Sequence, residues 1–185
     1  DAFRDLGAEL IELEVPDVMR FNDLQQILGK TEAAVICGKW MRERPGDMTF
    51  AAISVVQEGL LKPATRYLEA KSLRGPLLDA HIREIYGQVD VLFAPALAGP
   101  TPTIAETDFG DQDRVEELFT RSARFTRFTN YLGTPSLSVP CGFSASGLPV
   151  GFQLHGPPFG EARLLAAAHA YQSVTDHHTR APALS

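Results

Sequence analysis

Few residues of this 185-residue chain combine the types and spacing that bond-breaking chemistry requires. Many serine hydrolases carry Gly-x-Ser-x-Gly at a sharp strand-to-helix turn. The nearest stretch, from Gly142 to Gly147, misses the final glycine and falls in an expected hairpin turn. The pattern Ser-x-x-Lys is absent from the sequence. The residue types therefore argue against a catalytic serine in this chain.

Cys141 is a second candidate nucleophile, because a thiolate activated by a histidine can attack a carbonyl carbon. His155 lies on the neighbouring expected strand and could approach the thiol. The alternative is an unreactive buried cysteine, and cysteine is among the residue types most often buried. The apolar surroundings of Cys141 in the sequence favour this second reading.

The five histidines show no metal-binding arrangement. Two histidines at helical spacing around a carboxylate, as in zinc hydrolases, do not occur, and His177 and His178 stand in a polar tail. His81 lies on an apolar helical stripe, which favours a half-buried, hydrogen-bonded residue. No GxGxxG motif or phosphate-binding loop is present. We expect neither a metal ion nor a cofactor.

A polar stripe on one expected helix points to binding instead of catalysis. Ser122, Thr126 and Asn130 follow one another at intervals of four residues, just before the helix-ending Gly133. A buried asparagine without partners costs about 1–3 kcal/mol, so Asn130 either ties the helix end to the following turn or faces a pocket. Arg74 leaves a similar choice, between a buried ion pair and a pocket.

These side chains require a scaffold, and the hydropathy pattern predicts alternating helices and strands, which is typical of an α/β fold. Helices are expected to begin near residues 21, 50, 64, 113 and 161, and strands to cover 10–15, 89–94, 137–143 and 148–155. Asp113 and Glu116 resemble a capping box, Asp47 or Thr49 could cap the helix near residue 50, and Pro76 is expected to kink or split its helix. The helix from residue 161 is expected to bury Leu164 and Leu165.

The strand over 137–143 has two different faces. Its large side chains share one face, and the other carries only small ones: Ser136, Ser138, Pro140 and Gly142. A face of small residues lets another backbone or a ligand approach closely. The stretch 95–110 is a long loop with no periodicity, and such loops often carry function.

Composition limits the class of protein. Seventeen Lys and Arg against 23 Asp and Glu give a net charge of −6, which argues against nucleic-acid binding. No apolar run approaches the ~18–20 residues that span a bilayer, and the two distant cysteines favour a cytoplasmic setting. The chain begins at Asp1 in what resembles the end of a helix, so we expect a segment of a longer protein. Residues 176–185 are expected to form a mobile tail.

A longer pattern resembles the C-terminal part of amidase-signature enzymes, and the similarity extends over nearly the whole chain. Its most specific blocks are Asn130-Tyr-Leu-Gly133-Thr-Pro135-Ser-Leu-Ser138-Val-Pro140-Cys-Gly142, then Gly147-Leu-Pro149-Val-Gly151-Phe-Gln153, then Phe159-Gly-Glu161. The resemblance implies an α/β fold with a mixed sheet covered by helices, and hydrolysis of amide C–N bonds without metal or cofactor.

The resemblance also implies where the chemistry lies. In this family a serine nucleophile acts with a second serine, held in a cis peptide, and a lysine, all in the N-terminal half. The Gly/Ser-rich stretch that carries them is absent here, so no catalytic residue is assigned in this segment. Residues 1–185 would be the C-terminal part of one amidase domain. Thr126 and Asn130 are the expected substrate-binding residues, and the loop 95–110 is the expected rim of the entrance.

The partners implied are a small-molecule amide, the N-terminal half of the same enzyme and, as an option, a second copy of the protein. One alternative is a non-catalytic binding or assembly domain. Another is the A subunit of a tRNA-linked glutamine amidotransferase, whose members usually carry Asn-Leu-Ala-Gly where this chain has Asn130-Tyr-Leu-Gly133; the difference favours a stand-alone amidase. Alone, the segment is expected to be inactive and to self-associate through open strand edges.

Overall fold

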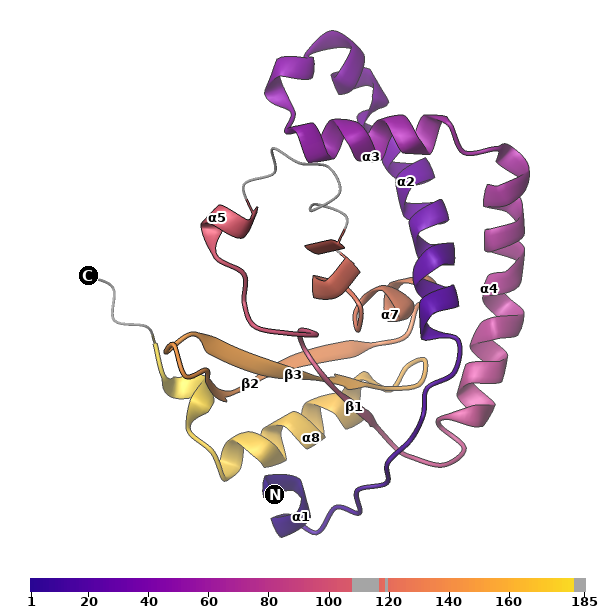
Figure 1. Ribbon diagram of the computed structural model, residues 1–185. Helices are drawn as coiled ribbons and strands as arrows, with labels where there is room; N and C mark the ends of the chain where they lie inside the picture. The colour runs from indigo at the N-terminus through magenta and orange to yellow at the C-terminus, as the bar shows by residue number, and fades with distance from the viewer. Residues whose placement is uncertain (108–116, 119, 182–185) are drawn as a thin grey trace.

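The computed structural model describes residues 1–107, 117, 118 and 120–181 (Figure 1). The helices with defined bounds are α1 (Ala2–Asp5), α2 (Val18–Glu43), α3 (Phe50–Leu60), α4 (Ala64–Glu84), α5 (Ile104–Thr107), α7 (Arg127–Leu132) and α8 (Glu161–Ser173). Two short 3-10 turns are η1 (Pro45–Asp47) and η2 (His177–Thr179), and the strands are β1 (Leu92–Pro95), β2 (Ser136–Phe143) and β3 (Pro149–His155). The expected α/β class is confirmed.

The three strands form one sheet in the order β1-β3-β2, and both pairings are antiparallel. The predicted hairpin is confirmed: β2 and β3 are joined by residues 144–148, where Gly147 has a φ of +78°. An irregularity between Pro140 and Gly142 interrupts the register, and Gly142 has a φ of +139°. Glycine adopts these angles without the steric cost that a side chain would add. The resemblance implies a mixed sheet, but the strands among the described residues pair only in the antiparallel sense.

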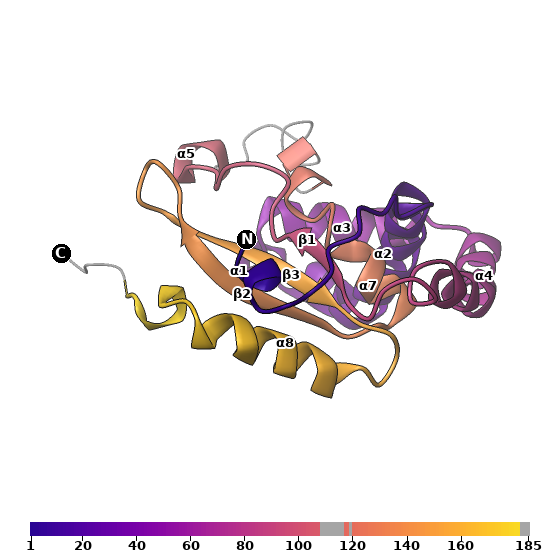
Figure 2. The same ribbon diagram turned by 90° about the horizontal axis from the view of Figure 1, so that it is seen from below.

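One face of the sheet packs against α8, as Figure 2 shows. The buried residues of this contact are Val139, Phe152, Leu154, Leu164, Ala168 and Tyr171. The ring of Phe3 in α1 lies 5.4 Å from Tyr171 and 5.9 Å from Phe152, between ring centres. The prediction for Leu165 was wrong, since this side chain is 60% exposed on α8. One face of α8 therefore packs against the sheet, and Leu165 lies outside that face.

The helices α2, α4 and α7 form a second layer on the opposite side of the strands (Figures 1 and 2). Their shared core consists of Phe21, Leu24, Ala70, Phe128, Tyr131 and Leu132. Two side-chain hydrogen bonds are made at this core: the Tyr131 hydroxyl donates to the Ala70 carbonyl oxygen at 2.7 Å, and Asn22 Nδ2 donates to the Arg124 carbonyl oxygen at 3.1 Å, while Asn22 Oδ1 is buried without a partner among the described residues. These hydrogen bonds join segments that are distant in sequence.

Helices α2 and α3 cross closely at Gly59. A Cβ atom on Gly59 would lie 1.9 Å from the Lys30 carbonyl oxygen, so only glycine permits this approach. Beside the crossing, Lys30 Nζ lies 2.6 Å from Glu58 Oε2. Of the two candidate caps, Asp47 and Thr49, the helix uses Thr49, whose side chain accepts a hydrogen bond from the Ala52 amide at 3.2 Å.

Several expectations differ from the structure. Residues 10–15 form no strand, because none of the described strands pairs with them. Pro76 does not split its helix, and α4 continues through it. The loop 95–110 contains α5, and its last residues lie outside the described part. The proposed capping box at Asp113 and Glu116 also lies outside the described residues.

The segment expected to be a mobile tail contains a short 3-10 turn near its start. Residues 177–179 form η2, which contacts β2. Arg180 Nη2 lies 2.8 Å from Asp176 Oδ2, and the His177 ring stacks 6.5 Å from the ring of Tyr171.

Of the helices described, none is both long and apolar enough to cross a membrane.

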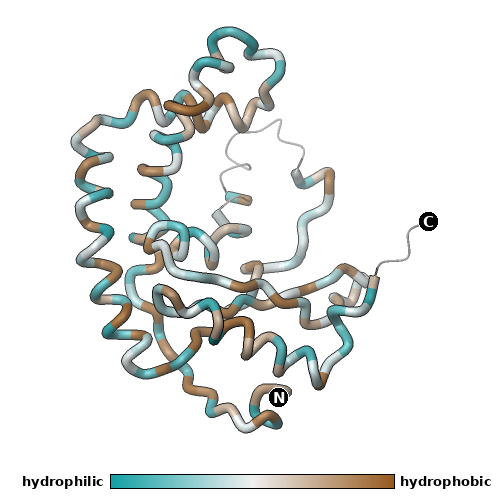
Figure 3. Tube along the Cα trace, turned by 180° about the vertical axis from the view of Figure 1, so that it is seen from behind, coloured by the Kyte–Doolittle hydropathy of each residue, from teal (hydrophilic) through white to brown (hydrophobic). Residues whose placement is uncertain are grey.

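Hydrophobic residues also recur on the outer surfaces of the helices, and Figure 3 shows them at intervals along α3 and α4. Val35 and Leu61 are each 82% exposed, Ile104 is 89% exposed and Phe159 is 95% exposed. Scattered apolar residues are common on protein surfaces, but contiguous apolar patches mark contact sites. The cores described above therefore account for only part of the apolar side chains.

The buried hydrogen bond of Tyr131 gives a stability prediction. Tyr131→Phe leaves the Ala70 carbonyl oxygen without its side-chain donor inside the core, so we expect a loss of about 1–2 kcal/mol in the free energy of unfolding. Urea titration followed by circular dichroism measures it. Tyr67→Phe is the matched control, since the Tyr67 hydroxyl donates to Glu32 in an exposed position. Equal unfolding midpoints for the two variants would contradict the prediction.

Candidate functional site

The sheet face opposite α8 is lined by small and polar side chains. Ser136 and Ser138 of β2 are exposed, whereas the side chain of Val139, also on β2, is buried against α8. On β3, a Cβ atom at Gly151 would lie 3.0 Å from the Val139 carbonyl oxygen, and 3.7 Å from Ser138 Oγ. The predicted division of this strand into a large and a small face holds from Ser136 to Pro140. After the irregularity Gly142 pairs with Val150, which lies on the same side as Phe152, so the prediction for Gly142 was wrong. The small face leaves room for a ligand or another chain segment to approach the backbone.

Gln153 is the buried polar residue of this face. It lies on the central strand β3, opposite Ala94 of β1 and Ser138 of β2, and is 5% exposed. Its Oε1 accepts a hydrogen bond from Ser136 Oγ at 3.2 Å, and its Nε2 donates to the Ala96 carbonyl oxygen at 3.3 Å. Gln153 belongs to one of the sequence motifs, but the sequence predicts no role for it. The feature that could have indicated a role is its position in the middle of a hairpin strand.

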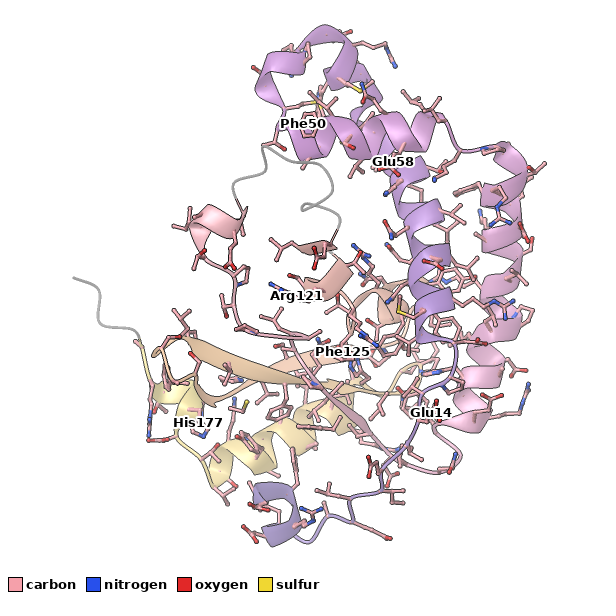
Figure 4. The ribbon with its side chains drawn as sticks, in the orientation of Figure 1. Glu14, Phe50, Glu58, Arg121, Phe125 and His177 are labelled. Atoms are coloured by element: carbon pink, nitrogen blue, oxygen red, sulfur yellow. The ribbon has the colours of Figure 1, made fainter. Side chains whose placement is uncertain are left out.

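The polar stripe predicted on one helix is interrupted. Residues 123–126 form a turn, and α7 begins after Thr126. The Thr126 hydroxyl donates to the Ala123 carbonyl oxygen at 3.1 Å and thereby closes the turn. Arg121 and Phe125 come from the same stretch, on the side of the sheet opposite α8 (Figure 4). Ser122 and Asn130 therefore do not share one continuous helix.

Asn130 is exposed near the C-terminal end of α7. Gly133 ends the helix with a φ of +75°, as predicted, and the amides of Gly133 and Thr134 donate to the Thr129 carbonyl oxygen at 2.7 and 3.2 Å. The backbone alone therefore closes this helix end. Arg74 is exposed beside Gly133, so the buried ion pair considered for it is wrong.

A groove of about 460 Å³ lies between α2 and α3. Figure 4 labels Phe50 and Glu58 on its α3 wall. Its other lining residues include Ala33, Cys37, Met48, Val55, Thr120 and Arg127. The Lys30–Glu58 ion pair lies within the lining. The groove combines an apolar wall with a neutralised charge pair, which suits an apolar group better than an ion.

Two buried histidines flank Phe128 beneath the helical layer. The Phe128 ring centre lies 6.0 Å from His81 and 5.0 Å from His155. Neither imidazole has a hydrogen-bond partner among the described residues, so the expectation of a half-buried, hydrogen-bonded His81 is wrong. Burial lowers the pKa of His81, and burial together with His81 lowers the pKa of His155 to about 4. Both rings are neutral at pH 7.

Cys141 and His155 do not form a catalytic pair. The Cys141 side chain packs with the cluster of Val139, Leu154 and Tyr171 on the α8 side of the sheet, whereas His155 contacts Phe128 on the opposite side. Burial raises the pKa of the Cys141 thiol, which disfavours the reactive thiolate. In the part of the chain that the structure describes, no three His, Cys, Asp or Glu residues gather as a metal site would require.

Comparisons with known proteins agree over nearly the whole chain. The family model described as Amidase matches residues 2–165. An amidase of Pseudomonas putida is 36% identical over 185 residues, which is 100% of this chain and 39% of that protein. The A subunit of a glutamyl-tRNA(Gln) amidotransferase of Ralstonia nicotianae is 41% identical over 122 residues, which is 63% of this chain and 22% of that protein.

A solved structure agrees with these sequence relatives. The structure of a 6-aminohexanoate cyclic dimer hydrolase complexed with substrate matches with a TM-score of 0.82 at 20% identity, covering 98% of this chain and 41% of that one. At this identity the match shows the fold alone. The chain spans about two-fifths of the length of the amidase and of this hydrolase.

The buried His155 gives a prediction for stability against pH. The unfolded chain binds a proton at this residue below its ordinary pKa of 6.5, and the folded chain only below about 4. Stability is therefore lost as the pH falls from 6.5 to 4, by about 3 kcal/mol at most. In urea titrations between pH 7 and 5, His155→Leu should show a shallower loss than the parent chain. His178→Leu, at an exposed position, is the control; parallel curves for all three proteins would contradict the prediction.

Proposed function

The chain belongs to the amidase family, and we propose that it forms the C-terminal, pocket-shaping part of a hydrolase that cleaves carboxylic amide C–N bonds. The observation that carries the proposal is the match along residues 2–165, supported by 36% identity to an amidase over the whole chain. Cys141, the candidate nucleophile of this chain, faces α8 with a raised pKa. Catalysis by a serine, a second serine in a cis peptide and a lysine is therefore proposed upstream of this segment.

In this proposal the N-terminal half of the enzyme is the first partner. Among the described strands, β1 and β2 each pair only with β3, so each presents an outer edge. Open edges hold unpaired backbone donors and acceptors that favour pairing with another strand. The small residues Ser136 and Ser138 on the adjacent face leave space for the catalytic layer.

Thr126 and Asn130 are proposed to contact the substrate, a small-molecule amide. The Thr126 hydroxyl donates within its turn and keeps lone pairs that can accept from an amide N–H. The exposed Asn130 side chain can donate to and accept from an amide group at once. The segment 95–107 would form part of the rim. These groups orient a substrate and leave bond-breaking to the other half.

The cellular setting and assembly are also proposals. Both cysteines are free thiols, which fits a reducing compartment such as the cytoplasm. Exposed apolar residues such as Leu61 and Ile104 would favour association, with the rest of the enzyme or with a second copy of the protein.

The second candidate function is that of an amidotransferase A subunit, which the 41% identity over 122 residues favours. That match covers 63% of this chain, whereas the amidase match covers all of it. The stand-alone amidase is therefore preferred. The two functions differ in the amide that is cleaved, which for a glutamine amidotransferase is glutamine.

A chimera tests the proposed function. The matching C-terminal region of the Pseudomonas putida amidase is replaced by this chain, and hydrolysis is measured over aliphatic and aromatic amides. We expect turnover by the chimera, and none by the same chimera after its upstream catalytic serine is changed to alanine. A folded chimera that hydrolyses no amide would contradict the proposal. Hydrolysis of glutamine alone, dependent on amidotransferase partner subunits, would favour the second candidate.

The active chimera also tests the proposed binding residues. Asn130→Ala removes a hydrogen-bonding group from the pocket, and we expect KM to rise about tenfold, with kcat changed less, because one hydrogen bond contributes about 1.4 kcal/mol. Steady-state kinetics on one amide measure both constants. Gln172→Ala on α8 is the control, since it lies on the far side of the sheet. An unchanged KM for Asn130→Ala would remove Asn130 from the site.

A further inference from the structure

The side chain of Gln153 reaches beyond its own strand. Its strand neighbours Phe152 and Leu154 are buried against α8, so the Gln153 amide lies on the opposite face. The residue is 5% exposed, and a buried amide without partners is costly. Both ends of the amide are satisfied, by Ser136 Oγ at 3.2 Å and by the Ala96 carbonyl oxygen at 3.3 Å.

Ala96 is the residue at which the chain leaves the sheet after β1. Its amide donates to the Gly151 carbonyl oxygen at 3.1 Å, and its own carbonyl oxygen accepts from Gln153 Nε2. Both backbone polar groups of Ala96 are therefore held by β3, one through the main chain and one through a side chain. The path of the following residues is fixed at this point.

The segment that follows has a second fixed end. At the start of α5, the Thr103 amide donates to Glu106 Oε2 at 2.7 Å, and the Glu106 amide donates to Thr103 Oγ1 at 3.2 Å. This reciprocal capping box closes the stretch 96–103, which also contains Pro100 and Pro102. Proline restricts the backbone of such a stretch. Residues 96–103 therefore form a short strap between the Gln153 contact and the cap.

We propose that Gln153 is a positioning residue that fixes the start of the strap, residues 96–103, and thereby sets the rim through which the amide substrate enters. The part about the substrate rests on the proposed function. A glutamine is required because its side chain donates to a carbonyl oxygen and accepts from a hydroxyl at the same time. An ionised glutamate has the same shape but no donor.

Gln153→Glu is therefore the sharpest variant. When ionised, it places a carboxylate oxygen where Nε2 lay, 3.3 Å from the Ala96 carbonyl oxygen, and the two acceptors repel. When protonated, it regains a donor. Burial raises the pKa of a carboxyl group, so this switch falls within an accessible pH range. Among the described residues, other charged or titratable groups border the region: His155, whose pKa is about 4, Arg121, whose Cδ would lie 3.8 Å from a Cβ on Gly99, and Glu106, whose carboxylate accepts from the Thr103 amide.

Hydrogen exchange on the 185-residue chain, read by mass spectrometry over peptides that span 96–103, tests the contact. At pH 8 we expect Gln153→Glu to raise exchange in the strap about tenfold above the parent, after correction for intrinsic rates, since one hydrogen bond is lost. At pH 5 the difference should shrink. Gln153→Met, which has no donor at any pH, should raise exchange equally at both. Gln172→Glu on α8 should change nothing.

Two results would overturn the positioning role. One is unchanged exchange in 96–103 for both Gln153 variants; the other is an equal rise throughout the chain, which would indicate general destabilisation. Ser136→Ala separates the two hydrogen bonds. It removes the donor to Gln153 Oε1 and leaves the Ala96 bond, so strap exchange should stay within about twofold of the parent. A tenfold rise in Ser136→Ala would place the control of the strap elsewhere.

The chimera then tests the link to substrate. Gln153→Glu should raise KM about tenfold at pH 8 and less at pH 5.5, with kcat changed less than KM. A KM that does not respond while strap exchange does would overturn the role at the entrance and keep the contact. An inactive parent chimera would overturn the proposed function, whereas the exchange result on the chain alone would stand.

Discussion

The alternation of side chains along β3 is the constraint on which the rest of the structure depends. Both other strands pair with β3, so its register fixes theirs. Phe152 and Leu154 point to α8, and Gln153 and His155 point to the other side. A slip of one residue would place the polar pair in the α8 core and the apolar pair on the open face. The sheet therefore has one stable register and two chemically different faces.

Among the described residues, the second face contacts the helical layer through His155 and Leu92. His155 contacts Phe128 of α7, and Leu92, opposite His155 in β1, packs against the same helical core. Toward the other end of β2, Ser138 stays exposed. Among the described residues the face is thus covered on the central strand β3, where His155 and Gln153 are buried, and exposed along β2 at Ser136 and Ser138. An open region next to a rigid sheet is where a site would be held most accurately.

The sequence predicts the features whose cause is local. Gly133 in the left-handed region, the Thr49 cap and the hairpin closed by Gly147 are each determined by a few adjacent residues. It fails where distant partners decide. Residues 10–15 alternate like a strand but have no described strand beside them, and the regular spacing of Ser122, Thr126 and Asn130 conceals a turn at 123–126. Gln153 gained its role from Ala96, 57 residues away, which no local pattern reveals.

The open face carries neutral polar groups among the described residues. Ser136, Ser138 and Gln153 carry no charge, and His155 is neutral above about pH 4. Burying an unpaired charge is far more costly than burying a neutral polar group. An uncharged amide group therefore loses less hydration free energy than an ion would when it moves from water to a site lined by neutral dipoles. In the proposed function, a wall of hydroxyl and amide groups would suit the recognition of an amide, and the charged groups of bond cleavage would be supplied by residues outside this chain. The contribution of this part would be the placement of backbone and dipoles, with Gln153 holding the path of the strap.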